Sequence, residues 1–102
     1  MIRCDCAERI GIEVKTWKEY EELKCFFEKQ VKNDIFVEEL AAQPYYIWKN
    51  RNRKIEYYAT KWYRCRSCGC LWEFEYPDFP ANGFVKKYSD GIYSGTTVIE
   101  ND

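Results

Sequence analysis

The sequence comprises 102 residues, with 16 Lys and Arg against 17 Asp and Glu and a formal net charge of -1. A chain of this length fits one domain whose core leaves little surplus stability, so that a bound metal would matter for folding. The balanced charge argues against a general polyanion-binding protein, and the absence of histidine removes the most common general base.

The first third of the chain predicts a strand followed by a helix. Apolar and other residues alternate over 9–14, as in a half-buried strand. Thr16 and Glu19 then form a capping box, which predicts a helix over 17–32. Apolar residues recur along it every three or four positions and should pack on a sheet; they are Trp17, Tyr20, Leu23, Phe27 and Val31.

The middle of the chain is rich in aromatic and branched residues. After a break at Asn33 and Asp34, residues 35–37 suit a short strand, and residues 38–42 suit either a strand end or a helical turn before Pro44. Residues 45–48 and 55–63 have the composition of strands, and the polar stretch 49–54 suits a loop between them. This pattern predicts an antiparallel hairpin.

The last third contains a cysteine-rich turn between two strands. Residues 71–76 alternate cleanly until Pro77, residues 77–83 have loop chemistry, and 84–88 suit a last strand before an acidic, frayed end at 100–102. The expected fold class is α+β, with one amphipathic helix packed on an antiparallel sheet and a zinc knuckle joining two strands. We expect residues 1–102 to form a single zinc-stabilised domain.

Six cysteines have to be explained. The sequence shows no secretory signal and no apolar run long enough to cross a membrane, which predicts a cytoplasmic protein with no membrane partner. In a reducing compartment, metal binding or free thiols explain cysteines better than disulfides do. A secreted disulfide framework is the competing interpretation.

The cysteine spacing predicts one Zn²⁺. In Cys65-x-x-Cys68-Gly69 the short spacer lets both thiolates face one ion, and Gly69 permits a backbone conformation that other residues rarely adopt. Because zinc favours four ligands and the chain has no His, Cys4 and Cys6 complete the predicted site. With four thiolates no position is open for water, which indicates a structural ion.

The cysteines allow several alternative interpretations. Cys70 or Cys25 can replace one of the four predicted ligands, although Cys25 also suits a small buried residue of the helix. The four cysteines can hold iron instead, as in rubredoxins. The Cys65–Cys68 pair can be a redox pair, although thioredoxin-like pairs start a helix. The chain can also bind no metal.

Two segments of the sequence resemble known families of proteins, one resemblance implying a structural feature and the other a function. Residues 57–76, with Cys65, Cys68 and Gly69, resemble a zinc-ribbon half-site, which implies a metal knuckle. The stretch from Trp62 to Cys65, with Trp72 and the segment 77–87, is similar to small bacterial immunity proteins of polymorphic and contact-dependent toxin systems. That resemblance implies binding of a protein toxin.

The sequence lacks the usual catalytic motifs of an enzyme, such as a glycine-rich loop that binds phosphates or a nucleophile next to a general base. We therefore expect a non-enzymatic protein that binds another protein. An acidic surface would suit the basic cleft of a nuclease toxin, and solvated surface is the competing interpretation. Its candidate residues are Glu38, Glu39, Glu73, Glu75 and Asp78.

The alternative function is a nucleic-acid-binding zinc-ribbon module. The predicted hairpin loop carries four basic residues between Trp48 and Tyr57, which can contact phosphates and stack on bases. These basic residues are Lys49, Arg51, Arg53 and Lys54.

Overall fold

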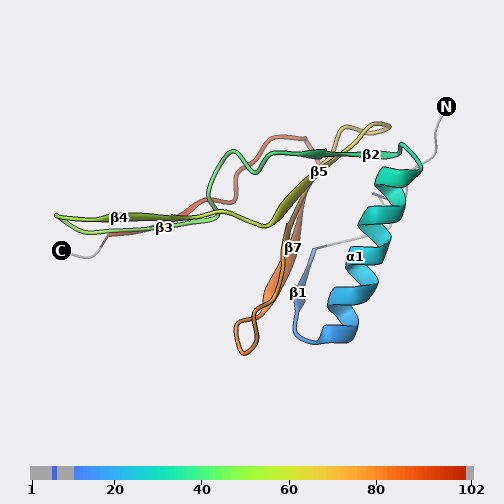
Figure 1. The fold of residues 1–102 in the computed structure, drawn as a ribbon. Coiled ribbons are helices and arrows are strands. Elements are labelled where there is room, and N and C mark those ends of the chain that lie inside the picture. The colour runs from blue at the N-terminus through green and yellow to red at the C-terminus, as the bar shows by residue number, and fades with distance from the viewer. Residues whose placement is uncertain (1–5, 7–10, 101–102) are drawn as a thin grey trace.

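The computed structural model describes Cys6 and residues 11–100. Within this part of the chain, one helix packs against one of two sheets, which confirms the α+β class (Figure 1). The elements are β1 (Ile12–Val14), α1 (Trp17–Lys32), β2 (Phe36–Glu39), β3 (Tyr46–Lys49), β4 (Lys54–Tyr57), β5 (Lys61–Cys65), β6 (Leu71–Glu75), β7 (Gly83–Tyr88) and β8 (Thr97–Glu100).

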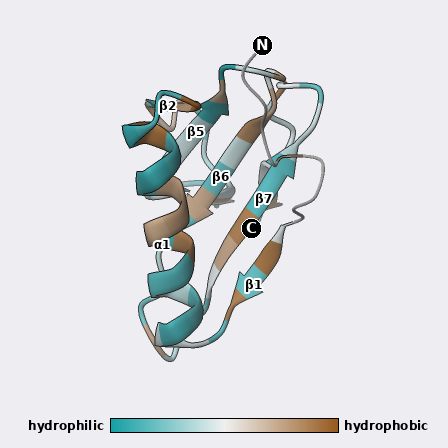
Figure 2. Ribbon diagram, turned by 90° about the vertical axis from the view of Figure 1, so that its right-hand side faces the viewer, coloured by the Kyte–Doolittle hydropathy of each residue, from teal (hydrophilic) through white to brown (hydrophobic). Residues whose placement is uncertain are grey.

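The larger sheet has five antiparallel strands in the order β1-β7-β6-β5-β2, and α1 runs along one of its faces (Figure 2). Phe27 lies at the centre of this layer with none of its surface exposed. Its ring stacks on Tyr63 of β5, with centroids 4.6 Å apart, and meets Trp72 of β6 edge-on at 5.8 Å. The predicted helix-on-sheet packing is therefore confirmed.

The helix begins and ends where the capping pattern predicts. Thr16 Oγ1 accepts a hydrogen bond from the Glu19 amide at 3.1 Å, and Glu19 Oε1 accepts one from the Lys15 amide at 3.1 Å. One member of the apolar stripe differs from expectation, because Trp17 is 59% exposed. Its ring nevertheless contacts Phe79 edge-on at 4.8 Å, in the loop before β7.

The opposite face of the large sheet is covered by the segment after β7. Tyr93 stacks on Trp62 at 4.7 Å between ring centroids, and both rings pack with Leu71 and Ala59 in a second buried cluster. Because side chains alternate along a strand, β6 contributes Trp72 to the helix side and Leu71 to this side. The sheet therefore has a core on each face.

The smaller sheet, β4-β3-β8, projects from the large sheet as an arm, which we define as residues 46–57 and 97–100 (Figure 1). This projection gives the molecule its elongated extents of 51 × 28 × 20 Å. The arm corrects the prediction of a single strand over 55–63, because that segment is divided into β4 and β5, which belong to different sheets.

The division occurs at Thr60, where Glu75 of β6 binds the chain. Glu75 Oε1 accepts hydrogen bonds from the Thr60 hydroxyl at 2.7 Å and the Thr60 amide at 3.1 Å. Its other oxygen accepts from the Tyr45 hydroxyl at 2.9 Å, just before β3. Glu75 therefore holds both ends of the β3–β4 hairpin against the large sheet.

Other boundaries also differ from the predictions. Residues 38–42 form no helical turn, since Glu38 and Glu39 complete β2. Of the end predicted to be frayed, Glu100 instead completes β8, which pairs in parallel with β3, and Lys49 Nζ lies 2.9 Å from a carboxylate oxygen of Glu100; residues 101–102 lie outside the described part. The early strand is confirmed at 12–14, whereas residues 7–10 lie outside the described part. No helix within 11–100 has the length and hydrophobicity to cross a bilayer.

Candidate metal centre

The β5–β6 connection forms a tight turn that presents two cysteines. Cys65 is the last residue of β5, and its backbone amide donates to the Cys70 carbonyl at 3.0 Å, while the Gly69 amide donates to the Cys65 carbonyl at 2.9 Å. Gly69 has a φ of +80°, as its position in the predicted knuckle requires. A side chain there would meet no neighbouring atom, so the requirement for glycine is conformational.

Cys6 approaches this turn from the start of the chain. The Sγ atoms of Cys6, Cys65 and Cys68 all lie within 4.8 Å of one another. Sulfurs around a tetrahedral zinc ion, with bonds of about 2.3 Å, are about 3.8 Å apart. The three thiols are therefore close enough together to bind one metal ion. Cys6 and Cys65 are buried, whereas Cys68 lies at the surface.

Hydrogen-bond donors point at two of these sulfurs. The indole Nε1 of Trp72 donates to Cys6 Sγ at 3.4 Å, and the Cys68 amide donates to Cys65 Sγ at 3.5 Å. Such donors stabilise thiolates more than thiols. The turn and β6 thus contribute groups suited to negatively charged sulfur.

Lys87 of β7 binds the backbone beside the cluster. Its Nζ donates to the Cys6 carbonyl at 2.6 Å and lies 5.6 Å from the centroid of the Trp72 ring. Cys6 is therefore held by β6 through its sulfur and by β7 through its carbonyl.

Burial and mutual contact shift the thiol pKa values in different directions. Burial raises the pKa of Cys6 far above the ordinary thiol range and also raises the pKa of Cys65. Burial acts in the same direction on Cys68, but the Cys70 amide and the neighbouring thiols lower the pKa of Cys68 to about 7. A divalent ion would favour the thiolate form of all three, with release of protons.

The structure brings together three of the four predicted ligands. Cys4 lies outside the described residues. Cys70, the alternative ligand, is 2% exposed; its pKa is raised to about 11, mainly by burial, with an opposing contribution from the Cys6 thiol and a raising one from the Cys68 thiol. Cys25 is exposed on α1, so its expected burial is wrong. The sequence did not reveal Trp72 and Lys87, since no motif links them to the cysteines.

Two of the predicted acidic partner-binding residues lie together on β2. Glu38 pairs with Lys61 at 2.8 Å between Oε1 and Nζ, with half of its side chain exposed. Glu39 pairs with Arg64 at 2.7 Å. Both carboxylates border a groove of about 840 Å³ that also contains Leu40 and Tyr58. The exposed fraction is 85% for Leu40 and 46% for Tyr58.

The other predicted acidic residues are dispersed. Glu73 has no exposed surface; its carboxylate accepts hydrogen bonds from the hydroxyls of Tyr88 and Tyr93, both at 2.9 Å. It therefore presents no charge at the surface, which corrects its assignment to a partner-binding face. Glu75 holds the arm, as described above. Asp78 is exposed in the loop before β7, away from the β2 pair.

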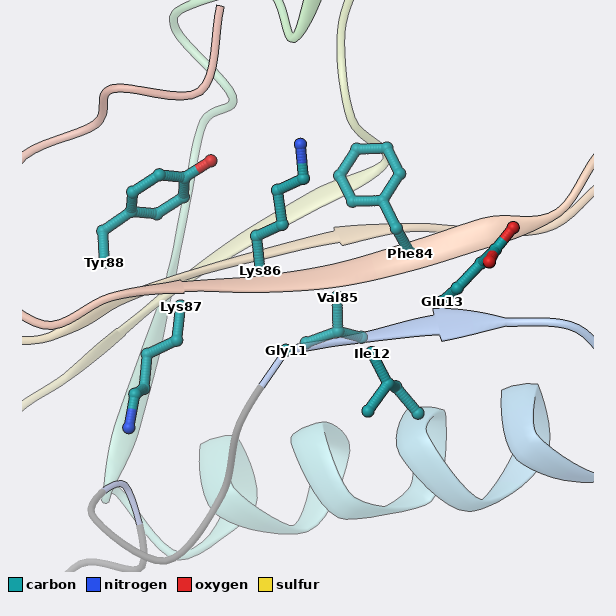
Figure 3. A pocket seen from close by; sticks show the side chains of 8 residues that line it. All are labelled: Gly11, Ile12, Glu13, Phe84, Val85, Lys86, Lys87 and Tyr88. Atoms are coloured by element: carbon teal, nitrogen blue, oxygen red, sulfur yellow. The ribbon is translucent and has the colours of Figure 1, made fainter.

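A second hollow, of about 490 Å³, lies along β1 and β7 (Figure 3). Its labelled side chains do not converge, because Lys86 and Tyr88 project from one side of β7 and Lys87 from the other. This hollow therefore does not gather polar side chains around one point.

Comparison of the sequence and structure with protein-family models, curated proteins and solved structures gave no match.

Proposed function

We propose that Cys6, Cys65 and Cys68 bind one structural Zn²⁺ in a non-enzymatic protein-binding domain. The observation that carries this proposal is the convergence of three thiols from distant parts of the chain to within 4.8 Å. Clustered thiolates are ligands that zinc favours, and the donors from Trp72 and the Cys68 amide suit an all-thiolate site. An ion there would tie the N-terminal segment to the β5–β6 turn.

Cys4 is the proposed fourth ligand, with Cys70 as the alternative. Cys4 precedes Cys6 by two positions, whereas Cys70 is buried beside the thiols of Cys6 and Cys68 but is not one of the three that lie within 4.8 Å of one another. The two assignments differ in a measurable way. Cys4→Ser should weaken zinc binding by at least about 10-fold in a competition titration with a chromogenic chelator, while Cys70→Ser should leave zinc affinity within about 2-fold. The reverse pattern would assign the site to Cys70.

The partner we propose is a protein toxin, which makes the chain an immunity protein. Support comes from the groove beside β2, which combines an exposed apolar side chain, Leu40, with the carboxylates of Glu38 and Glu39. A toxin surface with an apolar anchor and basic residues around it would fill this groove and compete for the carboxylates. The buried Glu73 takes no part in this surface.

Co-expression with the product of an adjacent toxin gene tests this function. We expect a stable complex and rescue of growth, both lost in Leu40→Asp, which places a charge in the groove. Ile92→Asp is the matched control, because Ile92 is 68% exposed outside the groove. Failure of the wild-type protein to form a complex or to rescue growth would refute the immunity function. Equal loss of toxin binding in Leu40→Asp and Ile92→Asp would refute the groove as the binding site.

A further inference from the structure

The arm has one face that is apolar and aromatic. Strand register places Tyr46 opposite Tyr57, and Trp48 opposite both Ile55 and Ile99. Because these rows are two residues apart on β3, they lie on the same face, and the Tyr46 and Tyr57 rings touch edge-on at 5.7 Å. We call this surface the arm face; it consists of Tyr46, Trp48, Ile55, Tyr57 and Ile99.

The arm face is not covered by the rest of the described chain. Its five side chains are all at least partly exposed, reaching 45% for Tyr57 and 42% for Ile99. None of them belongs to either buried cluster of the large sheet. On the opposite face, by contrast, the charges are paired: Lys49 with Glu100 at 2.9 Å and Lys54 with Glu56 at 3.6 Å.

The tip of the arm carries two cations without acidic partners. Asn50 Oδ1 accepts hydrogen bonds from the amides of Asn52 at 2.9 Å and Arg53 at 2.8 Å, which fixes the turn. Within the described residues, the exposed side chains of Arg51 and Arg53 make no ion pair or hydrogen bond. With four basic and two acidic residues, the arm is positively charged, in contrast to the chain as a whole.

We propose that the arm binds single-stranded nucleic acid, with bases stacked on Tyr46, Trp48 and Tyr57 and phosphates paired with Arg51 and Arg53. Stacking rings beside unpaired cations is the combination that binds single strands without base-specific readout. Tyr46 and Trp48 are about 6.7 Å apart along β3, so that each ring can receive a separate base. This activity is additional to the proposed toxin binding and uses a different surface.

The same observations disfavour two other occupants. Bases of a duplex are stacked on one another and cannot lie on a protein ring without being unstacked. A second copy of the chain laid on the arm face would bring a second set of unpaired arginines into the same assembly, with no unpaired carboxylate on the arm to receive them. Unpaired positive charge beside stacking surface instead complements a polyanion with exposed bases.

Fluorescence anisotropy with labelled oligo-dT and oligo-rU of about 12 nucleotides, each compared with a duplex of equal length, tests the proposal. We expect the single strands to bind and the duplex to bind at least about 10-fold more weakly. Arg51→Gln with Arg53→Gln should reduce the slope of log affinity against log salt by about 1.4, the value for two lost phosphate contacts. Trp48→Leu, which keeps apolar volume without a stacking surface, should weaken binding roughly 5- to 150-fold.

The matched control is Lys18→Gln with Lys29→Gln, which removes the same charge from the exposed surface of α1. We expect it to bind single strands within about 2-fold of wild type, since the lost charges are far from the arm. Circular dichroism verifies that each variant is folded. The proposal is overturned if single strands do not bind at about 50 mM salt, or if the control loses as much affinity as the arm variants. It is also overturned if the wild type is a dimer that Trp48→Leu converts to a monomer.

Discussion

The body, which we define as α1 and the five-stranded sheet β1-β7-β6-β5-β2, and the arm use similar strand sequences in opposite ways. In the body, Tyr63 and Trp72 are directly opposite on β5 and β6 and are covered by α1. In the arm, Trp48 and Ile55 are opposite on β3 and β4, and no described element covers them. The difference lies in what packs on the strands rather than in their composition. Buried rings stabilise the fold, whereas exposed rings are available for binding.

The two regions also differ in how they are fastened. In the body, the thiols of Cys6, Cys65 and Cys68 lie within 4.8 Å of one another, and the proposed metal ion would join the N-terminal segment to the β5–β6 turn there. The arm is attached by polar contacts at its base, where Glu75 binds Tyr45 and Thr60, and the Pro44 carbonyl accepts from the Thr96 hydroxyl at 2.7 Å. Substitutions in the cysteine cluster and substitutions at the base of the arm should therefore destabilise different parts of the molecule.

The largest expected effect is that of Cys65→Ser on the body. Removing the buried Cys65 thiol, a proposed zinc ligand, should abolish metal binding and lower the free energy of unfolding by at least about 3 kcal/mol, since metal binding and folding are coupled. Thermal unfolding followed by circular dichroism measures this change. Cys25→Ser is the control, because Cys25 is exposed on α1, and it should shift stability by less than about 0.5 kcal/mol. Equal stability of the two variants would show that the cysteine cluster does not close the fold.

Glu75→Ala should loosen the arm while leaving the body closed. It removes the acceptor for Tyr45 and for both donors of Thr60, which should cost about 2–3 kcal/mol locally. Hydrogen exchange should accelerate in β3 and β4 but not in β6, and zinc content should be unchanged. Asp78→Ala removes a carboxylate that makes no side-chain bond within the described part of the chain and should leave exchange unaltered. Uniform acceleration across both sheets would contradict the separation of body and arm.

A smaller effect is expected at the start of α1. Thr16→Ala removes the oxygen that accepts from the Glu19 amide and should lower the free energy of unfolding by about 1 kcal/mol. Chemical denaturation can resolve this change. Thr16→Ser keeps the hydroxyl and should retain most of the stability; a loss equal to that of alanine would exclude capping as the cause.

The smallest expected effect is that of Glu73 on how the free energy of unfolding varies with pH. Burial raises the pKa of Glu73 above its ordinary value of 4.5, against the opposing hydrogen bonds of Tyr93 and Tyr88. Between the ordinary and the raised pKa, the folded state holds more protons than the unfolded state, so stability falls as pH rises. The free energy of unfolding, measured by chemical denaturation at several pH values, should no longer decline in Glu73→Gln. Glu22→Gln, which changes an exposed residue of α1, should leave the decline in place. A decline unchanged in Glu73→Gln would assign it to another group.

Local patterns were sufficient for the elements whose signals are short-range. The bounds of α1 follow from the Thr16 cap and the apolar spacing, and the turn after Cys65 follows from the cysteine spacing and Gly69. The arm was only partly predictable. Its hairpin has a local signature, whereas the parallel pairing of β8 with β3 depends on contacts distant in sequence.

The candidate sites show the same limit. The convergence of Cys6 with Cys65 and Cys68 was inferred because zinc requires more ligands than the knuckle provides. By contrast, Glu73 and Glu75 both belong to an alternating strand and differ only in what packs around them. Burial of Glu73 depends on Tyr93, which arrives from a segment with no periodic pattern. Composition alone therefore placed Glu73 on a surface that it does not reach.

The most direct test of the metal centre is the zinc content of the folded protein, measured by native mass spectrometry alongside elemental analysis. We predict one zinc ion bound per chain in the wild type and in Cys25→Ser, and none in Cys65→Ser. Removal of the ion by a strong chelator should unfold the wild-type chain, and added Zn²⁺ should restore it. A wild-type protein that is stably folded without any bound metal would contradict the account.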